Sequence, residues 1–165
     1  MTFYPIDTRA RTTLIPSVLK AGTTTGVSVG DRWSISGTVN GSASIVDNRL
    51  NLVSGSSYYL EGSVLVRNTS ANGLLVWQWY NASNSSWVGS EGYMNLQTSY
   101  AATARVSRRV ASAFIPDSSI STFLNLELRI KTITGSNWSF TVDAGGISGY
   151  TFVGYPSIRL LELPT

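Results

Sequence analysis

The stretch FLNLELRIKTI, residues 123–133, indicates the fold class of this chain of 165 residues, because apolar and polar side chains alternate along it. The apolar set is Leu124, Leu126, Leu128 and Ile130. The polar set is Asn125, Glu127, Arg129 and Lys131. Successive side chains of a strand point to opposite faces of its sheet. The pattern therefore predicts an antiparallel strand with one face in the core and the other in water.

The same period of two recurs on both sides of this stretch, separated by clusters of Gly, Asn and Ser. Further strands are expected at Trp33–Val39, Ile45–Val53, Tyr58–Arg67, Val106–Ile115 and Asn137–Val142. The short Gly135-Ser136 link predicts a hairpin between the strand at 123–133 and the one at 137–142. No long stretch has the apolar spacing of an amphipathic helix. The chain is therefore predicted to be all-β, an antiparallel sandwich or jelly roll.

Two segments are apolar on both faces, Leu74–Tyr80 and Ile158–Leu163. A sandwich strand needs only one apolar face, so the second face requires a second cover. Another subunit is one cover, and the alternative is that loops or the N-terminal segment of the same chain fold over these strands. The first interpretation makes five residues candidates for a subunit interface: Trp77, Trp79, Tyr80, Leu161 and Leu163.

The first 30 residues differ from the rest, because they are apolar without a clean period and contain Pro5, Pro16 and the Thr23–Gly26 turn. We expect an extended N-terminal arm over residues 1–30 and a β domain over residues 31–165. The alternative is an edge strand and a loop belonging to the same domain. The arm would bind a partner through its apolar side chains, Phe3, Tyr4, Ile6, Leu14, Ile15 and Leu19.

The composition argues against catalysis, because the chain contains no His and no Cys. This excludes a histidine base, a cysteine nucleophile and a Cys/His zinc site. Paired carboxylates are the remaining enzymatic option, with Glu61 and Glu127 on strand faces that could be neighbours. Nearby Arg67 and Arg129 favour an arginine-paired face instead. The expectation is a protein that is not an enzyme, with no catalytic residues, metal site or cofactor.

Charge and hydropathy point to neither nucleic acid nor membrane as a partner. The net charge is only +3 and the basic residues are scattered. No apolar run approaches the ~18 residues of a membrane helix. Aromatic residues are the enriched class of side chain, with five Trp and eight Tyr. Trp87 ends the polar segment Asn81–Ser86 and is a possible ligand contact, or else it caps the edge of the core.

Several stretches of the chain together resemble one family. They are Tyr58–Ser63 (YYLEGS), Gln78–Asn81 (QWYN), Trp87–Gly92 (WVGSEG), Ala113–Ile115 (AFI), Leu126–Ile130 (LELRI) and Ile158–Leu163 (IRLLEL). In these, and over about Tyr58–Thr165, the chain resembles phage virion proteins with a tumour-necrosis-factor-like jelly roll. The shared stretches include no catalytic motif.

The resemblance implies a tight homotrimer whose last strand lies near the three-fold axis. Such proteins occur as decoration or cement proteins on capsids and as tail-fibre heads. The chain opens at Met1 and has no heptads or repeat shaft, so an arm and a head are expected.

That layout favours a capsid decoration protein on the outer surface of the virion, with itself and the major capsid protein as partners. Deleting residues 1–30 is then expected to leave a folded trimer that no longer binds capsids. The alternative is a tail-fibre or receptor-binding head that recognises host carbohydrate.

Overall fold

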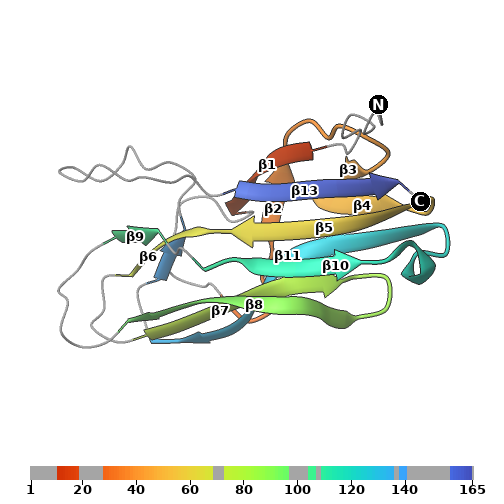
Figure 1. Ribbon diagram of the computed structural model, residues 1–165. Coiled ribbons are helices and arrows are strands. Elements are labelled where there is room, and N and C mark those ends of the chain that lie inside the picture. The colour runs from red at the N-terminus through yellow and green to blue at the C-terminus, as the bar shows by residue number, and fades with distance from the viewer. Residues whose placement is uncertain are drawn as a thin grey trace, which may run out of the picture.

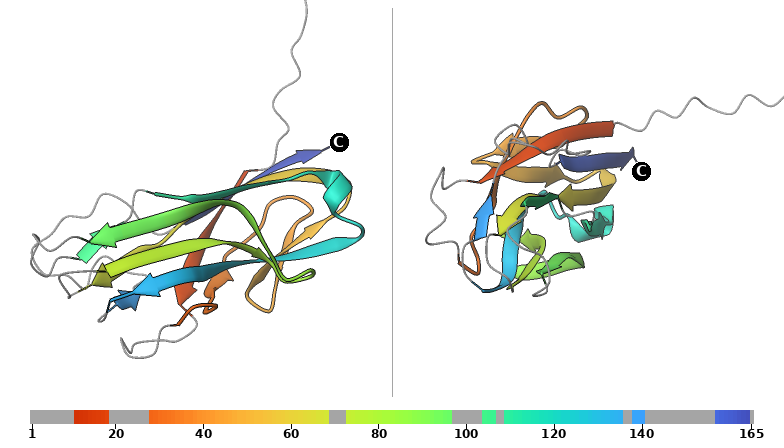
Figure 2. Two further views of the ribbon diagram at one scale, coloured as in Figure 1. Left: turned by 90° about the horizontal axis from the view of Figure 1, so that it is seen from below. Right: turned by 90° about the vertical axis from the view of Figure 1, so that its left-hand side faces the viewer.

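The computed structural model is a sandwich of two antiparallel five-stranded sheets, which confirms the predicted all-β class (Figure 1). It describes residues 11–18, 28–68, 73–96, 104–106, 109–135, 138–140 and 157–164. The β5 sheet has the order β10 (Ala111–Ile115), β5 (Ser56–Ser63), β13 (Ser157–Pro164), β1 (Arg11–Val18), β2 (Trp33–Ser36). The β11 sheet has the order β3 (Ser44–Val46), β4 (Arg49–Val53), β11 (Phe123–Thr134), β7 (Gly73–Asn81), β8 (Ser86–Leu96). Most of these strands run along the long axis of the molecule (Figures 1 and 2).

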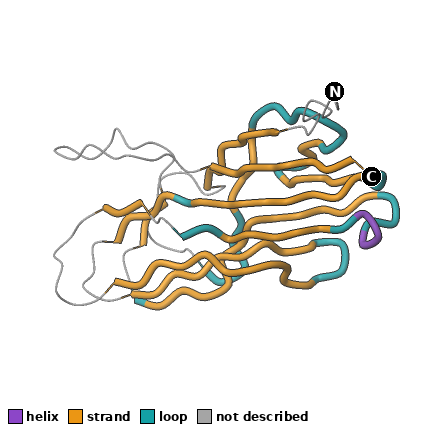
Figure 3. Tube along the Cα trace, viewed as in Figure 1, coloured by secondary structure: helices purple, strands orange, loops and turns teal. Residues whose placement is uncertain are grey.

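A third, three-stranded sheet lies at one end of the sandwich (Figure 1). Its order is β12 (Trp138–Phe140), β6 (Leu65–Asn68), β9 (Ala104–Val106). The single 3-10 turn of the described residues, η1 (Asp117–Ser119), lies at the opposite end (Figure 3). None of the helical residues in the described ranges forms a helix long and apolar enough to cross a membrane.

Eight strands of the sandwich pair in a nested order. In chain order these are β1, β4, β5, β7, β8, β10, β11 and β13. The first pairs with the last, the second with the seventh, the third with the sixth and the fourth with the fifth. The chain therefore runs like one long hairpin wrapped into two sheets.

The core lies between the two sheets and takes the predicted apolar face of β11, since Leu124, Leu126 and Leu128 are buried. Trp77 and Trp79 of β7 cross this core and are completely buried. The Trp77 indole N–H donates to the Gly62 carbonyl at 3.2 Å, and that of Trp79 donates to the Ala111 carbonyl at 3.1 Å. Both acceptors belong to the β5 sheet, so these two side chains join the sheets by packing and by hydrogen bonds.

One predicted strand, Ile45–Val53, is in fact a hairpin of β3 and β4. Its two-residue turn is Asp47-Asn48, with φ values of 50° and 60°. Asp and Asn tolerate this left-handed backbone better than other residues with a Cβ, which is why the chain reverses here.

Two other predicted strands are each divided between two sheets. Tyr58–Arg67 breaks at Val64 into β5 and β6, and Val106–Ile115 breaks into β9 and β10. β5 pairs with β10 in the sandwich, whereas β6 pairs with β9 in the small sheet. The same two segments therefore stay paired while they pass from one sheet to the other.

The predicted hairpin between residues 123–133 and 137–142 is wrong. β12 pairs with β6 rather than with β11. One edge of β11 is occupied by β7, and on the other edge Arg32 bridges to Arg129. Trp138 becomes 98% buried in this arrangement, and its indole N–H donates to the Thr134 carbonyl at 2.7 Å. Burial of a large aromatic side chain thus outweighs the local turn signal.

The N-terminal segment contributes a strand to the sandwich. β1 pairs with β13 through Arg11–Leu14 and with β2 through Ile15–Val18. Residues 11–18 are therefore an inner strand of the sandwich, between β13 and β2. This differs from both expectations for this segment, the extended arm and the edge strand. Of the arm candidates, Leu14 and Ile15 lie in β1, and the others lie outside the described residues, namely Phe3, Tyr4, Ile6 and Leu19.

Candidate functional site

The structure separates the five predicted interface residues into three places. Trp77 and Trp79 are fully buried within the chain, so their side chains have no surface to offer a second subunit. Leu161 and Leu163 are half-buried on the outer face of the β5 sheet. Tyr80 is half-buried on the outer face of the β11 sheet, the opposite side of the sandwich. These five residues therefore do not form one surface.

An apolar row crosses three strands on the outer face of the β5 sheet. We define the apolar row as Phe114, Tyr59 and Leu161, since Phe114 pairs with Tyr59 and Tyr59 pairs with Leu161. Phe114 is 57% exposed and Tyr59 is 38% exposed. The alternation of β5 and β10 turns these rings outward, away from the buried Leu60. Sequence analysis predicted strands at Tyr58–Arg67 and Val106–Ile115, but it did not single out either ring as a surface feature.

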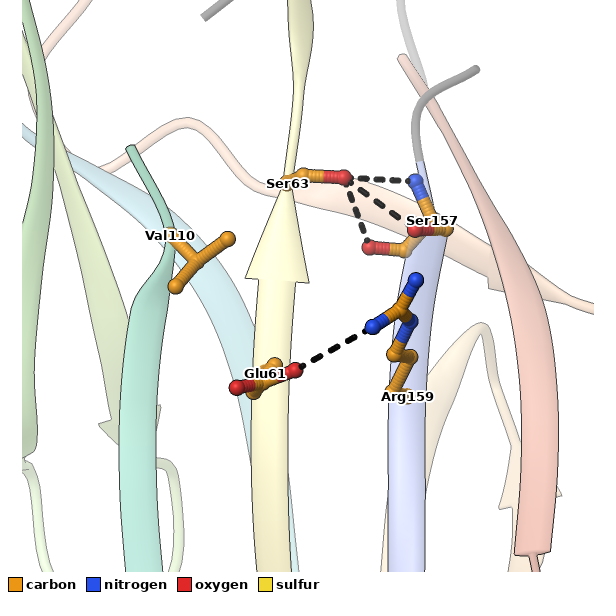
Figure 4. Close-up of a pocket in the computed structure, with 5 residues that line it drawn as sticks. All are labelled: Glu61, Ser63, Val110, Ser157 and Arg159. Atoms are coloured by element: carbon orange, nitrogen blue, oxygen red, sulfur yellow. Dashed lines mark hydrogen bonds and ion pairs between the residues drawn. The ribbon is translucent and has the colours of Figure 1, made fainter. Parts of the chain in front are cut away.

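A shallow polar hollow of about 130 Å³ lies on the same face (Figure 4). Its lining residues are Glu61, Ser63, Val110, Ser157 and Arg159. The Ser157 N–H donates to the Ser63 hydroxyl at 3.0 Å, and Arg159 lies 3.9 Å from the Glu61 carboxylate. Because the Arg159 side chain is 73% exposed, this ion pair contributes little to stability. The hollow therefore adds exposed polar groups to the sheet face that carries the apolar row.

A buried carboxylate and three arginines form the arginine cluster, which we define as Arg32, Arg49, Arg129 and Glu127, on the outer face of the β11 sheet. Glu127 has no exposed side-chain area, whereas the three arginines are 24–35% exposed. Arg32 Nη1 donates to Glu127 Oε1 at 2.6 Å, Arg49 Nε donates to the same oxygen, and Arg129 Nε donates to Oε2. One negative charge thus meets three positive ones, which leaves the cluster with a net charge of +2.

The backbone places each residue of the arginine cluster on the same outer sheet face. Arg129 follows Glu127 by two residues on the same face of β11. Arg49 follows the Asp47-Asn48 turn on the neighbouring strand β4, and Arg32 bridges to Arg129. Only the Glu127–Arg129 pair has a signal in the sequence, because Arg32 and Arg49 arrive from distant positions.

Glu127 is ionised in this environment. Burial raises its pKa, but the hydrogen bonds and charges of Arg129 and Arg32 outweigh burial and hold the pKa below the ordinary glutamate value. The expectation that this face of the strand lies in water is therefore wrong at Glu127, where arginine side chains replace the water.

Aromatic rings continue the arginine cluster toward β8. The guanidinium of Arg129 lies 3.8 Å above the centre of the Tyr80 ring. Trp87 packs edge-on against Tyr80, with ring centres 5.0 Å apart. Lys131 Nζ lies 5.7 Å from the Trp87 ring and pairs with Glu91 at 2.6 Å. Trp87 therefore lies half-buried on a sheet face, in contact with Tyr80, and not in the core.

The two carboxylates that sequence analysis considered as a catalytic pair do not meet. Glu61 lies on the outer face of the β5 sheet and Glu127 on the outer face of the β11 sheet, with the core between them. In the described ranges, no three acidic, His or Cys side chains gather closely enough to hold a metal ion.

A second buried carboxylate, Glu162 of β13, points inward. It accepts hydrogen bonds from the Ser42 N–H at 2.9 Å, from the Ser42 hydroxyl and from the Ser56 hydroxyl at 2.9 Å. These bonds hold the loop before β3 against the last strand. Sequence analysis did not foresee this role, since Glu162 sits between two leucines without a nearby partner in the chain.

No protein-family model and no curated protein matches this sequence. Function must therefore be inferred from the two outer faces of the sandwich.

Proposed function

We propose that this chain is a structural protein of a phage virion, a homotrimer that decorates and cements the outer capsid surface. The nested pairing of the eight strands supports a jelly roll, the fold that the family resemblance implies. The virion and the capsid are implied by that resemblance alone.

The observation that carries self-association is the apolar row. Phe114 and Tyr59 expose rings on a regular sheet face, where a monomer gains nothing from them. Leu161 extends the row onto β13, the last strand, which the resemblance puts near the three-fold axis. Glu61 and Arg159 lie beside the row with opposite charges, so charged groups of either sign on a neighbouring subunit would find a partner here. A stable contact would need about 800 Å² from each partner.

Mass photometry and sedimentation at micromolar concentration test this interface. The expected mass is about 53 kDa, three times the 17.8 kDa of the chain. Phe114→Glu places a charge in the row and is expected to give folded monomers, which keep a cooperative melting transition. The matched control is Phe123→Glu, since Phe123 is 53% exposed but begins β11 in the other sheet. The control is expected to stay trimeric.

Two results would contradict the trimer, a monomeric wild-type chain at these concentrations or a Phe114→Glu variant that stays trimeric. The capsid location is tested separately, by probing purified heads and purified tails of the virion for the chain. We expect it on heads, and its presence on tails alone would refute the decoration role.

A second candidate function is recognition of host carbohydrate by a receptor-binding head. It is favoured by the half-buried Trp87, whose ring lies beside Tyr80 and the arginine cluster on a sheet face.

A further inference from the structure

We propose that the arginine cluster and the adjoining Tyr80 and Trp87 rings form a binding site for an acidic saccharide, whose carboxylate or sulfate is held by the arginines. This inference rests on the second candidate function and names its ligand class. It does not depend on the trimer, because the site and the apolar row lie on opposite outer faces.

The charge of the cluster argues for an anion. Glu127 neutralises one of the three guanidinium groups, so a charge of +2 remains on the cluster itself. The neighbouring Lys131 adds nothing to this excess, because Glu91 pairs with it. On the same sheet face near the cluster, Asn51 and Asn125 are neutral and bond to each other at 2.9 Å.

The donors of the cluster are only partly used. Arg49 contacts Glu127 through Nε, and its two Nη nitrogens have no partner within the part of the chain that the structure describes. Arg32 contacts Glu127 through Nη1 alone. A guanidinium edge with two parallel N–H groups matches the two oxygens of a carboxylate or sulfate.

Glu127 also holds the three arginine side chains in place before a ligand binds. It anchors all three from a position that water does not reach, so little side-chain freedom remains to be lost when a ligand arrives. The partial exposure of the arginines, 24–35%, leaves their outer edges accessible.

The rings argue for a sugar as the carrier of the anion. Trp87 is half-buried next to Tyr80 and Arg129, and the C–H face of a sugar packs on the exposed part of such a ring. A small inorganic anion would contact the arginines but not the aromatic rings.

Calorimetric titration of the full chain tests the site with three oligosaccharides of equal length. One contains glucuronate, one carries sulfate esters, and one is the neutral glucose counterpart. At least one acidic probe is expected to bind at least tenfold more tightly than the neutral one, and about 0.5 M NaCl should weaken that binding. Binding of both acidic probes assigns the site to oxoanions in general, and binding of one selects the anion.

Two variants that each lose one positive charge distinguish binding at this site from a general attraction of acidic probes to a basic protein. Arg49→Gln is expected to weaken acidic binding at least tenfold, since Arg32 and Arg129 still hold Glu127. Arg159→Gln removes the same charge from the opposite sheet face, where Arg159 is 73% exposed, and should leave the affinity unchanged. Trp87→Leu should weaken acidic and neutral binding by similar factors.

An Arg49→Gln variant that keeps wild-type affinity would overturn the inference. Equal binding of the neutral and acidic probes would refute the anion site but keep carbohydrate recognition, and failure of all three probes would refute both. If Arg49→Gln unfolds, NMR of the wild-type chain decides. An acidic probe must shift the Trp87 indole signal and leave those of Trp77 and Trp79 in place, and any other pattern contradicts the site.

Discussion

Glu127 is a charged side chain that lies on a sheet face and yet has no contact with water. A buried carboxylate is tolerated only when its oxygens are paired, and here three arginines supply the pairing. The depressed pKa means that the folded state binds the ionised form in preference to the protonated one. Above the unfolded pKa of about 4.3, this preference stabilises the fold, and it is lost as the pH falls through the lower folded pKa.

Glu127→Gln should therefore destabilise the chain at pH 7. Removing one partner of a buried ionic group costs about 3 kcal/mol, which lowers the melting temperature by about 6–12 °C in a domain of this size. Thermal melts of both chains from pH 7 to pH 3 check this. The gap between the two melting temperatures should begin to shrink below about pH 4.3, where the carboxylate of the unfolded state takes up its proton. It should close only below the lower folded pKa, where the wild-type carboxylate is protonated in both states.

Glu61→Gln is the matched control for this experiment. Its carboxylate faces the exposed Arg159 at 3.9 Å, so its loss should cost less than about 1 kcal/mol. Equal melting temperatures of wild type and Glu127→Gln at pH 7, or a gap that stays constant down to pH 3, would refute the role assigned to Glu127.

Strands β8 and β10 bring the edges of the two sheets together. The Ser90 and Ser112 hydroxyls lie 2.7 Å apart across this contact. Gly89 of β8 has a φ of 73°, and a Cβ at this position would lie 2.0 Å from the Ser112 carbonyl oxygen. Only glycine meets both demands, a left-handed backbone and the close approach of a neighbouring strand.

Gly89→Ala should therefore destabilise the fold more than Gly55→Ala does. Both glycines have positive φ, but a Cβ at Gly55 would meet nothing within 4 Å. We expect about 1–2 kcal/mol for the left-handed backbone at Gly55. At Gly89 we expect about 1–3 kcal/mol more, because Ser112 and Ala113 must move. Urea denaturation of both variants measures the difference, and equal losses would show that the β8–β10 contact is not tight.

The whole molecule depends on β1, which connects the last strand of the chain to β2. Its first half pairs with β13 and its second half with β2. Without β1, the backbone groups of β13 on this side would lose their partners and form an open sheet edge.

Deleting residues 1–30 should therefore cost the chain its cooperative fold, instead of leaving the folded trimer that the arm model predicts. Deleting residues 1–10 is the control, because it stops before β1 begins and should preserve the melting transition. Circular dichroism melts and size-exclusion chromatography distinguish the two. A residue 31–165 fragment that melts like the full chain would show that β1 is dispensable.

Alternation along Phe123–Ile133 was enough to predict β11 and its buried face, because the period of two is a local property of the chain. The same reasoning predicted that Leu161 and Ile158 lie on opposite faces of the last strand. It failed at Ile45–Val53, where the turn residues Asp47 and Asn48 separate Ile45 from the alternating Leu50 and Leu52. It also failed at Trp77 and Trp79, since no local pattern tells a core tryptophan from an interface one.

The sequence by itself determined the fold class and the faces of the strands, since these follow from the spacing of apolar side chains. It also determined the absence of histidine and cysteine chemistry, since the composition contains neither residue. Only the tertiary structure decided which strands pair, that β12 joins β6, and that Arg32 and Arg49 meet Glu127. Arg32 and Glu127 are 95 positions apart in the chain, and Arg11 of β1 pairs with Leu161 of β13. The energy of such contacts depends on burial and charge in three dimensions.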